Sequence, residues 1–398
     1  MYNFDSLPNR KLDKCRKWDE SLLRQRFPKL PNEYIPMWIA DMDYATAPEI
    51  ISGLQELLLK GTLSYTYTYD EFYDVVVDWQ HRRHGVKVTR DMITLVYGTV
   101  STIHNIIQCF CTGSRKVIMN TPVYDPFALA AERNGVTVIA NTLIVRDNRY
   151  FIDMESLEQQ LQDHQPDVYL FCSPHNPSGR IWTREELVEV ATICRKYGTL
   201  LVVDEVHSEH ILFGNHISVG CLDVEVINQI ILLTSPNKAF NIGGLKTSYA
   251  LIWDEGLRCQ FREQLAKNSI TSPTPFGITA VIAAYRRGEE WLNAVTEYIR
   301  ENYLLVKERL KNDFPDWRLM DMEASYLCWV DVSRGKIPAS DLVPYLAEVS
   351  GVILEDGTHY VQDGENYVRI NIATSRELLL TALDQIKCAY EALYPDKG

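Results

Sequence analysis

The sequence predicts an α/β fold, in which a large domain with a mostly parallel seven-stranded sheet between helices is followed by a smaller α+β domain. From about residue 46 to 255, short runs rich in valine, isoleucine and leucine alternate with amphipathic segments of helical period, as in parallel sheets covered on both faces. After Gly288 this alternation stops, and a long helical segment precedes two strands and a last helix. We therefore expect an N-terminal segment 1–45 that joins the small domain, a large domain 46–287 and a small domain 288–398.

The individual elements follow from local patterns. Thr46-Ala-Pro48 opens a helix with an apolar face, and Gly61 closes it. Strands are expected at 92–97, 116–120, 136–140, 168–172, 200–204, 230–234 and 248–253, and helices at 100–111, 125–134, 154–163 and 183–197. The last third should contain a helix at 289–313, strands at 325–332 and 367–373, and a helix at 375–393. In parallel sheets of this kind, ligands bind at the carboxyl ends of the strands.

Composition and charge narrow the class of protein. Of the 398 residues 46% are hydrophobic and 23% are charged, as in globular proteins. The net charge of −13 argues against nucleic acid or an anionic membrane as the main partner. The basic residues between Arg10 and Lys17 are interrupted by Asp13, and we expect them to form a solvated N-terminal arm rather than a binding patch.

Nine cysteines are scattered along the chain without a CxxC pair or a His/Cys metal spacing. This pattern predicts reduced thiols rather than a disulfide framework, and it offers no metal site. The N-terminus lacks a charged and then apolar signal, and no apolar run approaches transmembrane length. We expect a soluble, cytoplasmic protein.

Three of the expected strands end in polar residues whose chemistry is complementary. Asn176 lies in Ser173-Pro-His-Asn-Pro-Ser-Gly179, Asp204 ends the strand 200–204, and Lys238 follows the strand 230–234. These are the groups that pyridoxal phosphate requires: a lysine for the imine, a carboxylate for the pyridine nitrogen and a donor for the ring oxygen. Each alone has a structural alternative, since the asparagine could belong to an ordinary turn and the aspartate to an ion pair or a helix cap.

Further residues complete a candidate site for that cofactor. Gly98 permits a tight turn, so that the amides of Val100 and Ser101 can face a phosphate at a helix N-terminus. The hydroxyl of Ser235 and the charge of Lys246 could also reach the phosphate. Strand–glycine–helix joints are common, however, and Lys246 could equally be a surface lysine.

Tyr124, His207 and Arg369 are the remaining candidates from the residue pattern. Tyr124 could stack on a flat heteroaromatic ring, or simply pack at a turn. His207 could reach the ring oxygen. Arg369 lies in an apolar strand and could hold the carboxylate of a substrate, although an internal ion pair is the alternative.

Over essentially its whole length the chain resembles fold-type I pyridoxal-phosphate enzymes of the aminotransferase superfamily, and more closely their cystathionine β-lyase (carbon–sulfur lyase) branch. The segments that carry the resemblance are Trp38-Ile-Ala-Asp-Met-Asp-Tyr-Ala-Thr-Ala-Pro48, Val96-Tyr-Gly98, Thr121-Pro-Val-Tyr-Asp-Pro-Phe127, Ser173-Pro-His-Asn-Pro-Ser-Gly179, Asp204-Glu-Val-His207 and Ser235-Pro-Asn-Lys-Ala-Phe-Asn241. The Ala-Asp-Met-Asp segment and the Asp-Glu-x-His quartet are specific to that branch.

The resemblance implies a role for each matching residue: Lys238 as the Schiff-base lysine, Asp204 on the pyridine nitrogen, Asn176 and His207 near the ring oxygen, Tyr124 on the ring, Val100, Ser101 and Ser235 on the phosphate, and Arg369 on the substrate carboxylate. It also implies a homodimer in which Tyr65 reaches the phosphate of the neighbouring subunit, with substrate near Ala40 and Tyr65. Two positions depart from the pattern, because many relatives have tyrosine in place of His207 and arginine in place of Lys246.

The function that we expect is α,β-elimination on L-cystathionine or L-cysteine-type substrates, which yields a thiol (homocysteine or hydrogen sulfide), pyruvate and ammonia. An aminotransferase shares every step through the carbanion, so that the motifs do not separate the two. A ligand-sensing regulatory protein that retains the fold is a third hypothesis. The preferred substrate is left open by the sequence.

Overall fold

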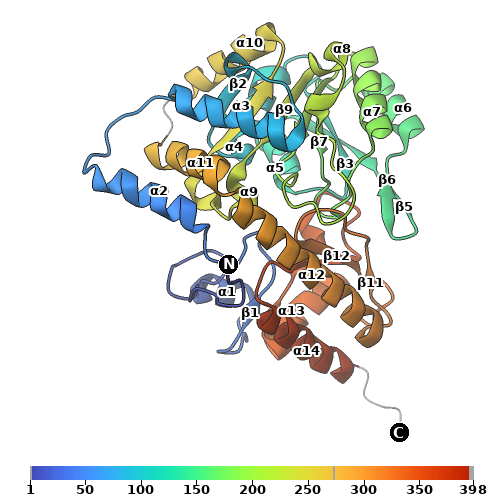
Figure 1. The fold of residues 1–398 in the computed structure, drawn as a ribbon. Coiled ribbons are helices and arrows are strands. Elements are labelled where there is room, and N and C mark those ends of the chain that lie inside the picture. Colours follow the sequence, from blue (N-terminus) through green and yellow to red (C-terminus); the bar gives the residue numbers. More distant parts are fainter. Residues whose placement is uncertain (1, 272–273, 394–398) are drawn as a thin grey trace.

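A seven-stranded sheet forms the centre of the computed structural model, which describes residues 2–271 and 274–393 (Figure 1). The strand order is β2-β10-β9-β8-β7-β3-β4. All neighbours are parallel except at β10, which runs antiparallel to both β2 and β9. The predicted fold class is therefore confirmed. The strands are β2 (Ile93–Val96), β3 (Lys116–Thr121), β4 (Thr137–Thr142), β7 (Val168–Cys172), β8 (Leu200–Asp204), β9 (Ile230–Thr234) and β10 (Ser248–Ile252).

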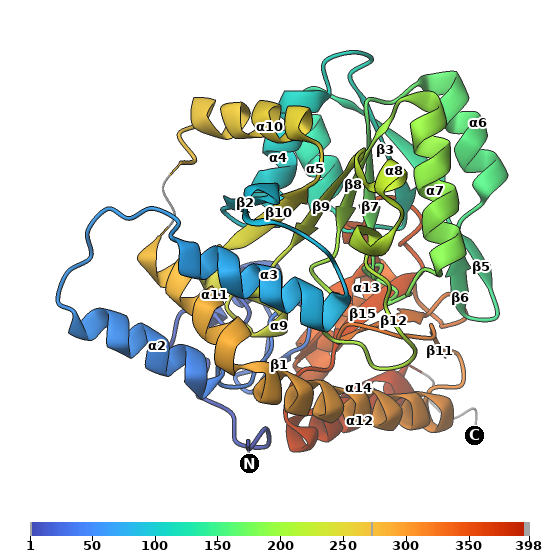
Figure 2. The ribbon, with the colours of Figure 1, turned by 45° about the horizontal axis from the view of Figure 1, so that its top comes forward.

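Helices cover both faces of this sheet (Figure 2). Alternate residues of a strand point to opposite faces, and in β8 Val202 belongs to one apolar cluster whereas Leu201 and Val203 belong to the other. The first cluster is closed by α4 (Thr99–Phe110), α5 (Pro126–Arg133) and α10 (Glu255–Lys267). The second is closed by α3 (Asp70–His84), α6 (Met154–His164), α7 (Arg184–Tyr197) and α11 (Pro275–Arg287).

A second, four-stranded antiparallel sheet has the order β11-β12-β15-β14. Its strands are β11 (Arg318–Leu319), β12 (Leu327–Asp331), β14 (Glu355–Asp356) and β15 (Tyr367–Asn371), and its helices are α12 (Glu289–Asp313), α13 (Ala339–Ser350) and α14 (Arg376–Ala392). The N-terminal segment joins this part, because β1 (Ile35–Pro36) pairs with β13 (Val352–Ile353). The domain boundaries themselves stay a prediction.

The remaining elements connect these layers. They are α1 (Glu20–Arg26), α2 (Pro48–Leu59), the hairpin of β5 (Ile144–Arg146) and β6 (Arg149–Phe151), α8 (Val224–Ile227), α9 (Pro236–Ala239), and short 3-10 turns at Arg90–Met92, Val219–Cys221, Gly243–Leu245 and Gly357–His359. Helices α3, α10, α11 and α13 and the shorter α1, α8 and α9 are absent from our predictions. In α3 the buried apolar residues alternate with charged ones, and α13 contains Pro344, so both patterns are weak in the sequence.

The expected solvated N-terminal arm is wrong for two of its basic residues. The side chain of Lys17 is only 1% exposed and lies 3.0 Å from the carboxylate of Asp43, which is equally buried. Arg10 is 11% exposed and donates to the Asp41 carboxylate at 2.7 Å. The physical reason is that these two carboxylates lie opposite the arm in the fold and neutralise its cations.

All nine cysteines are free thiols. Among the residues that the structure describes, no helix combines the length and the apolar character that crossing a membrane requires.

Candidate active site

A cavity of about 390 Å³ opens at the carboxyl ends of the parallel strands. It lies where the loops after β2, β3, β7, β8 and β9 meet, as expected for ligand sites in such sheets. All but two of the predicted site residues line it: Ala40, Val100, Ser101, Tyr124, Asn176, Asp204, His207, Ser235, Lys238 and Lys246. The two exceptions are Arg369 and Tyr65. The sequence therefore predicted which residues meet, although their roles stay predictions.

The cavity contains two ionisable side chains, Lys238 and Asp204, whose charged forms are disfavoured by burial. Lys238 lies in the short helix α9, and burial, followed by the nearby charge of Arg369, lowers the pKa of its amine to about 8. Asp204 is the last residue of β8 and only 6% exposed, and burial raises the pKa of its carboxyl group to about 7. Neither forms an ion pair within 4 Å among the described residues. Two such shifted groups in one cavity are typical of a functional site.

The amine of Lys238 donates a hydrogen bond of 2.7 Å to the backbone carbonyl of Ala40. The hydroxyl of Tyr326 donates to the same oxygen at 3.3 Å. The amine is therefore held by a neutral acceptor, and burial together with the charges around it sets its proton affinity.

The opposite end of the cavity is suited to an anion. Gly98 caps α4 with φ of +76°, a backbone conformation that favours glycine. Val100 and Ser101 follow in the first helical turn, where backbone N–H groups have no partner within the helix. Lys246 is exposed, and its stem lies 3.9 Å from the position that a Cβ atom at Gly98 would occupy. Together these groups are suited to an anion, and their predicted role in holding a phosphate stays a prediction.

Ser235 lines the cavity but already uses its hydroxyl group. The oxygen accepts a hydrogen bond from the amide of Asn237 at 3.1 Å, and its proton goes to the carbonyl of Thr247 at 2.9 Å. A phosphate would have to compete with that second bond.

His207, Asn176 and Tyr124 lie at the walls of the cavity. Burial lowers the pKa of His207 well below its usual value, so that the ring is neutral, and its Nδ1 lies 3.3 Å from the hydroxyl of Ser325. Asn176 is 5% exposed. Tyr124 is half-buried and lies edge-on to Phe127. These positions are compatible with the roles that the sequence predicts for them.

Arg369 projects from β15 toward the site without lining the cavity. One nitrogen donates to the carbonyl of Trp38 at 2.7 Å, and another lies 3.5 Å from the amide oxygen of Asn176. Its Nε is buried and has no hydrogen-bond partner. No carboxylate of residues 2–271 or 274–393 lies within ion-pair distance, which disfavours an internal ion pair. The guanidinium thus keeps a free charge for an anionic ligand.

Tyr65 lies outside the cavity of its own chain. It is fully exposed in the irregular segment between α2 and α3, which extends from the side of the molecule (Figure 1). The sequence prediction assigned Tyr65 to the site of a neighbouring subunit, and it stays a prediction.

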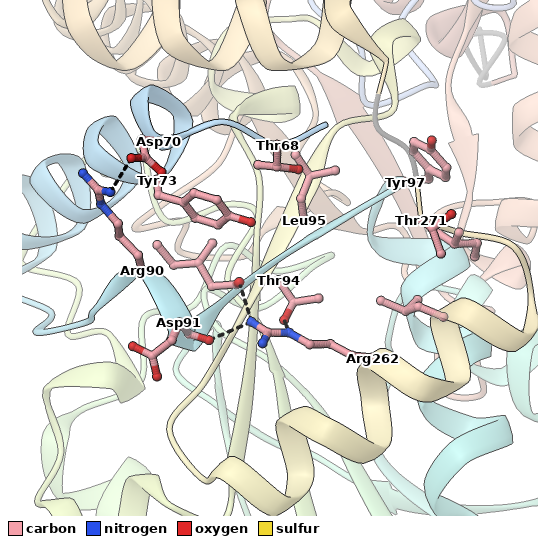
Figure 3. A pocket seen from close by; sticks show the side chains of 13 residues that line it. Thr68, Asp70, Tyr73, Arg90, Asp91, Thr94, Leu95, Tyr97, Arg262 and Thr271 are labelled. Carbon is pink, nitrogen blue, oxygen red and sulfur yellow. Dashed lines mark hydrogen bonds and ion pairs between the residues drawn. The ribbon is translucent and has the colours of Figure 1, made fainter. Parts of the chain in front are cut away.

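A second hollow lies beside β2 and differs in chemistry. Figure 3 shows that its charged side chains bond to the protein around them: Arg90 pairs with Asp70 at 2.9 Å, and Arg262 donates to Thr94 and to backbone carbonyls of Asp91 and Ile93. Groups that are satisfied in this way hold the structure together and offer little to a ligand.

The sequence prediction missed several residues that shape the site. Tyr326 and Asn371 bond to backbone carbonyls of Ile39, Ala40 and Asp41, and Asn241 bonds to the carbonyl of Met42. The sequence gives little sign of these residues, because each bonds to a carbonyl of residues 39–42 that lies about 200 or more positions away along the chain.

Comparison with known proteins agrees with this geometry. The model of the family "Aminotransferase class I and II" matches residues 33–386. Cystathionine beta-lyase PatB of Bacillus subtilis is 34% identical over 388 residues, which cover 97% of this chain and 99% of that protein. Two solved structures superpose with a TM-score of 0.93: cystalysin from Treponema denticola (29% identity; 99% and 100% of the chains covered) and a PLP-bound putative aminotransferase from Clostridium difficile (30%; 98% and 100%). The chain therefore belongs to the aminotransferase class I and II family, a family of pyridoxal-phosphate enzymes.

Proposed function

We propose that the protein is a pyridoxal-phosphate-dependent carbon–sulfur β-lyase. It would use L-cystathionine or an L-cysteine-type substrate and water, and release a thiol, pyruvate and ammonia. The observation that carries the proposal is the meeting of Lys238 and Asp204, both with shifted pKa values, in one cavity. The likeness to a cystathionine beta-lyase over nearly the whole chain supports the choice of reaction.

The residues of the cavity fit this cofactor at three points. The buried carboxyl group of Asp204 suits the protonated pyridine nitrogen, because a buried carboxylate needs a cation or a hydrogen-bond donor. The first turn of α4 with Lys246 suits the phosphate, and Lys238 lies in the same cavity for covalent attachment. When bound, the cofactor supplies an electron sink for negative charge at the substrate α-carbon.

The protein residues would then bind the substrate and move its protons. Arg369, which no carboxylate of the described chain neutralises, would hold the α-carboxylate. Lys238, with a pKa of about 8, is neutral in about a tenth of molecules at about pH 7, far more than an ordinary lysine, and in that form can accept the α-proton. The neutral ring of His207 and the amide of Asn176 would face the ring oxygen of the cofactor.

The proposal is tested with the purified holoenzyme and L-cystathionine, by measuring pyruvate, free thiol and pyridoxamine phosphate. We expect pyruvate and thiol in equal amounts, and their loss together with the yellow colour in Lys238→Ala. Lys196→Ala is the matched control, since that lysine is exposed and pairs with Glu158 on the protein surface. Turnover and colour that survive in Lys238→Ala would contradict the assignment.

An aminotransferase is the second candidate, because one of the solved structures with a TM-score of 0.93 is a putative aminotransferase. The two activities share the proton transfer at Lys238 and differ in the fate of the negative charge. Accumulation of pyridoxamine phosphate without pyruvate would favour the aminotransferase. A bound cofactor with neither product from any thioether amino acid would favour a regulatory protein.

A homodimer with shared sites is part of the proposal. The exposed apolar side chains of α2 and the segment after it support an interface there: Ile51, Leu58, Leu59, Leu63, Tyr65 and Tyr67. If Tyr65 serves the neighbouring subunit, mixing and refolding two inactive variants, Lys238→Ala and Tyr65→Ala, restores activity, since a mixed dimer has an intact site. Continued inactivity of the mixture, with dimers present by light scattering, would oppose shared sites.

A cytoplasmic location is also proposed. It is supported by the nine free thiols, five of which are not fully buried, since such thiols persist in reducing compartments. Fractionation of cells with an antibody to the protein would test it.

A further inference from the structure

Five consecutive backbone carbonyls next to the active site all accept hydrogen bonds from side chains. We call residues 38–43 the carbonyl segment. The donors are Arg369 to Trp38, Asn371 to Ile39, Lys238 and Tyr326 to Ala40, Asn371 and Lys17 to Asp41, and Arg10 and Asn241 to Met42. The segment belongs to no helix or strand. Besides backbone bonds from Asp41 to Ile39 and from Asp43 to Ala373, these side chains supply the hydrogen bonds that a regular backbone ladder would otherwise provide.

The N-terminal arm holds one end of this segment through buried charges. Lys17 donates to the carbonyl of Asp41 at 2.9 Å and to the carboxylate of Asp43 at 3.0 Å. The indole of Trp18 donates to the same carboxylate oxygen at 2.8 Å. Arg10 adds bonds of 2.6 Å to the carbonyl of Met42 and 2.7 Å to the carboxylate of Asp41. Charged groups that are buried and paired in this way form a rigid anchor.

The other end of the segment contacts the groups proposed to do chemistry. The Ala40 carbonyl accepts from Lys238, and the Trp38 carbonyl accepts from Arg369, both at 2.7 Å. The carbonyl that Lys17 holds is thus the direct neighbour, along the chain, of the carbonyl that receives Lys238. A displacement of Asp41 by even a fraction of an ångström would be passed to Ala40 through one planar peptide unit.

We propose that Lys17 and Arg10 are positioning residues of the active site, which fix the carbonyl segment so that Ala40 receives the free amine of Lys238 and Trp38 orients Arg369. The inference rests on the proposed role of Lys238 and extends it, because it gives the lysine a defined place whenever its amine is not bonded to cofactor. The competing interpretation is that the buried pair of Lys17 and Asp43 only stabilises the fold.

The two interpretations differ in what happens to the Lys238 amine. Loss of Lys17 removes the donor to the Asp41 carbonyl and leaves the Asp43 carboxylate without its closest cation. Water entry and an added negative charge both favour the ammonium form. Several other charges already act on Lys238, and they are present in every variant: Arg369, Asp41, Asp204 and Lys246. The lost charge alone could shift the amine in Lys17→Met, so the two interpretations are separated by a variant that removes both charges of the pair; there, a purely stabilising pair would leave the proton affinity of the amine unchanged.

The experiment titrates the Lys238 amine in the full-length chain after removal of cofactor. Brief acetylation over a series of pH values, followed by mass spectrometry of the peptide with Lys238, gives the pKa of that amine. We expect Lys17→Met to raise it by about one unit, so that roughly ten times less free amine is present at a given pH. The titration follows the amine and not turnover, so it remains interpretable if the lyase proposal fails.

Three further variants make the result decisive. The double variant Lys17→Met/Asp43→Asn has no unpaired buried charge, so it should fold even if Lys17→Met does not, and a shifted pKa in it reports the displaced Ala40 carbonyl rather than the lost charge. Tyr34→Phe removes a buried bond within the arm, to the carbonyl of Trp18. Lys387→Met removes a lysine from an ion pair in the small domain. Both controls should titrate like the wild type.

Two outcomes would overturn the inference. One is an unshifted titration in the double variant and in any folded Lys17→Met protein, whatever their melting temperatures. The other is a shift of equal size in Tyr34→Phe or Lys387→Met, which would show that general loosening of the structure is sufficient.

Discussion

Replacing Asp204 with asparagine should make the cofactor-stripped protein more stable at alkaline pH while abolishing lyase activity. Asp204 is 6% exposed, and burial raises the pKa of its carboxyl group from 3.8 to about 7. The carboxylate form is therefore disfavoured in the folded chain. Asparagine has nearly the same shape and does not ionise, so the variant avoids this cost. It also lacks the charge that would hold a protonated pyridine nitrogen.

The magnitude and sign follow from linkage between proton binding and folding. The folded protein binds this proton more tightly than the unfolded chain, so the stability that the group contributes is full below pH 3.8 and is lost as the pH rises to about 7. Each pKa unit corresponds to about 1.4 kcal/mol. Between about pH 5 and about pH 8 the wild type loses the equivalent of roughly two pKa units of stability. The free energy of unfolding of Asp204→Asn, relative to the wild type, should therefore rise over this range by at most about 3 kcal/mol.

Urea unfolding followed by tryptophan fluorescence, at about pH 5 and about pH 8, measures this difference. Asp331→Asn is the matched control. Burial acts to raise the pKa of Asp331, but hydrogen bonds from Ser333 and Arg318 outweigh burial and lower it. Asp331 is thus ionised at both pH values, and its replacement should cost the same stability at each. If the difference between Asp204→Asn and the wild type does not change with pH, the carboxyl group is not held in its protonated form and the reasoning fails.

Two other substitutions, one with a control variant, test the substrate site and the packing beside it. Arg369→Lys should raise KM for L-cystathionine about 10- to 100-fold with a smaller change in kcat, because lysine lacks the fork that can hold both Trp38 and a carboxylate; an unchanged KM in pyruvate assays would oppose this role. Gly179→Ala should cost about 3 kcal/mol in urea unfolding, since its Cβ would lie 2.4 Å from Met322 Cγ at φ of +70°. Gly214→Ala, at φ of +75° with nothing within 4 Å, should cost only about 1 kcal/mol.

The centre of the large sheet was predictable because strands β7, β8, β9 and β10 are buried on both faces. Runs such as Leu200–Asp204 and Ile230–Thr234 are almost entirely aliphatic, and these two end at a polar residue. Helix α3 escaped prediction for the opposite reason. Its buried residues, among them Phe72 and Trp79, are separated by charged residues that form ion pairs on the surface. The helical repeat of apolar residues is therefore weak in the sequence.

The active site was predictable only where its residues lie at strand ends. Asp204 and Lys238 end or follow neighbouring parallel strands, and the topology brings such ends to one edge of the sheet. The carbonyl segment is different. Lys17 looked like a solvated cation, because nothing local reveals that Asp43, 26 positions further along the chain, will be buried against it. Pairing of that kind is decided by tertiary packing, which a single sequence does not display.

The charged groups around the cavity do not neutralise one another, and this limits what the cavity can bind. Lys238, Asp204 and Arg369 each lack an ion-pair partner within the chain as the structure describes it. An uncompensated buried charge costs free energy, which a ligand of opposite charge offsets. A ligand with only one charge would relieve only one of these groups. In the proposed site, a cationic ring nitrogen would relieve Asp204, a substrate carboxylate would relieve Arg369, and Lys238 would be bonded to the cofactor instead of standing as a free ammonium. If these roles hold, charge selects the cofactor and the substrate carboxylate, whereas the choice between elimination and transamination must depend on other contacts to the substrate side chain.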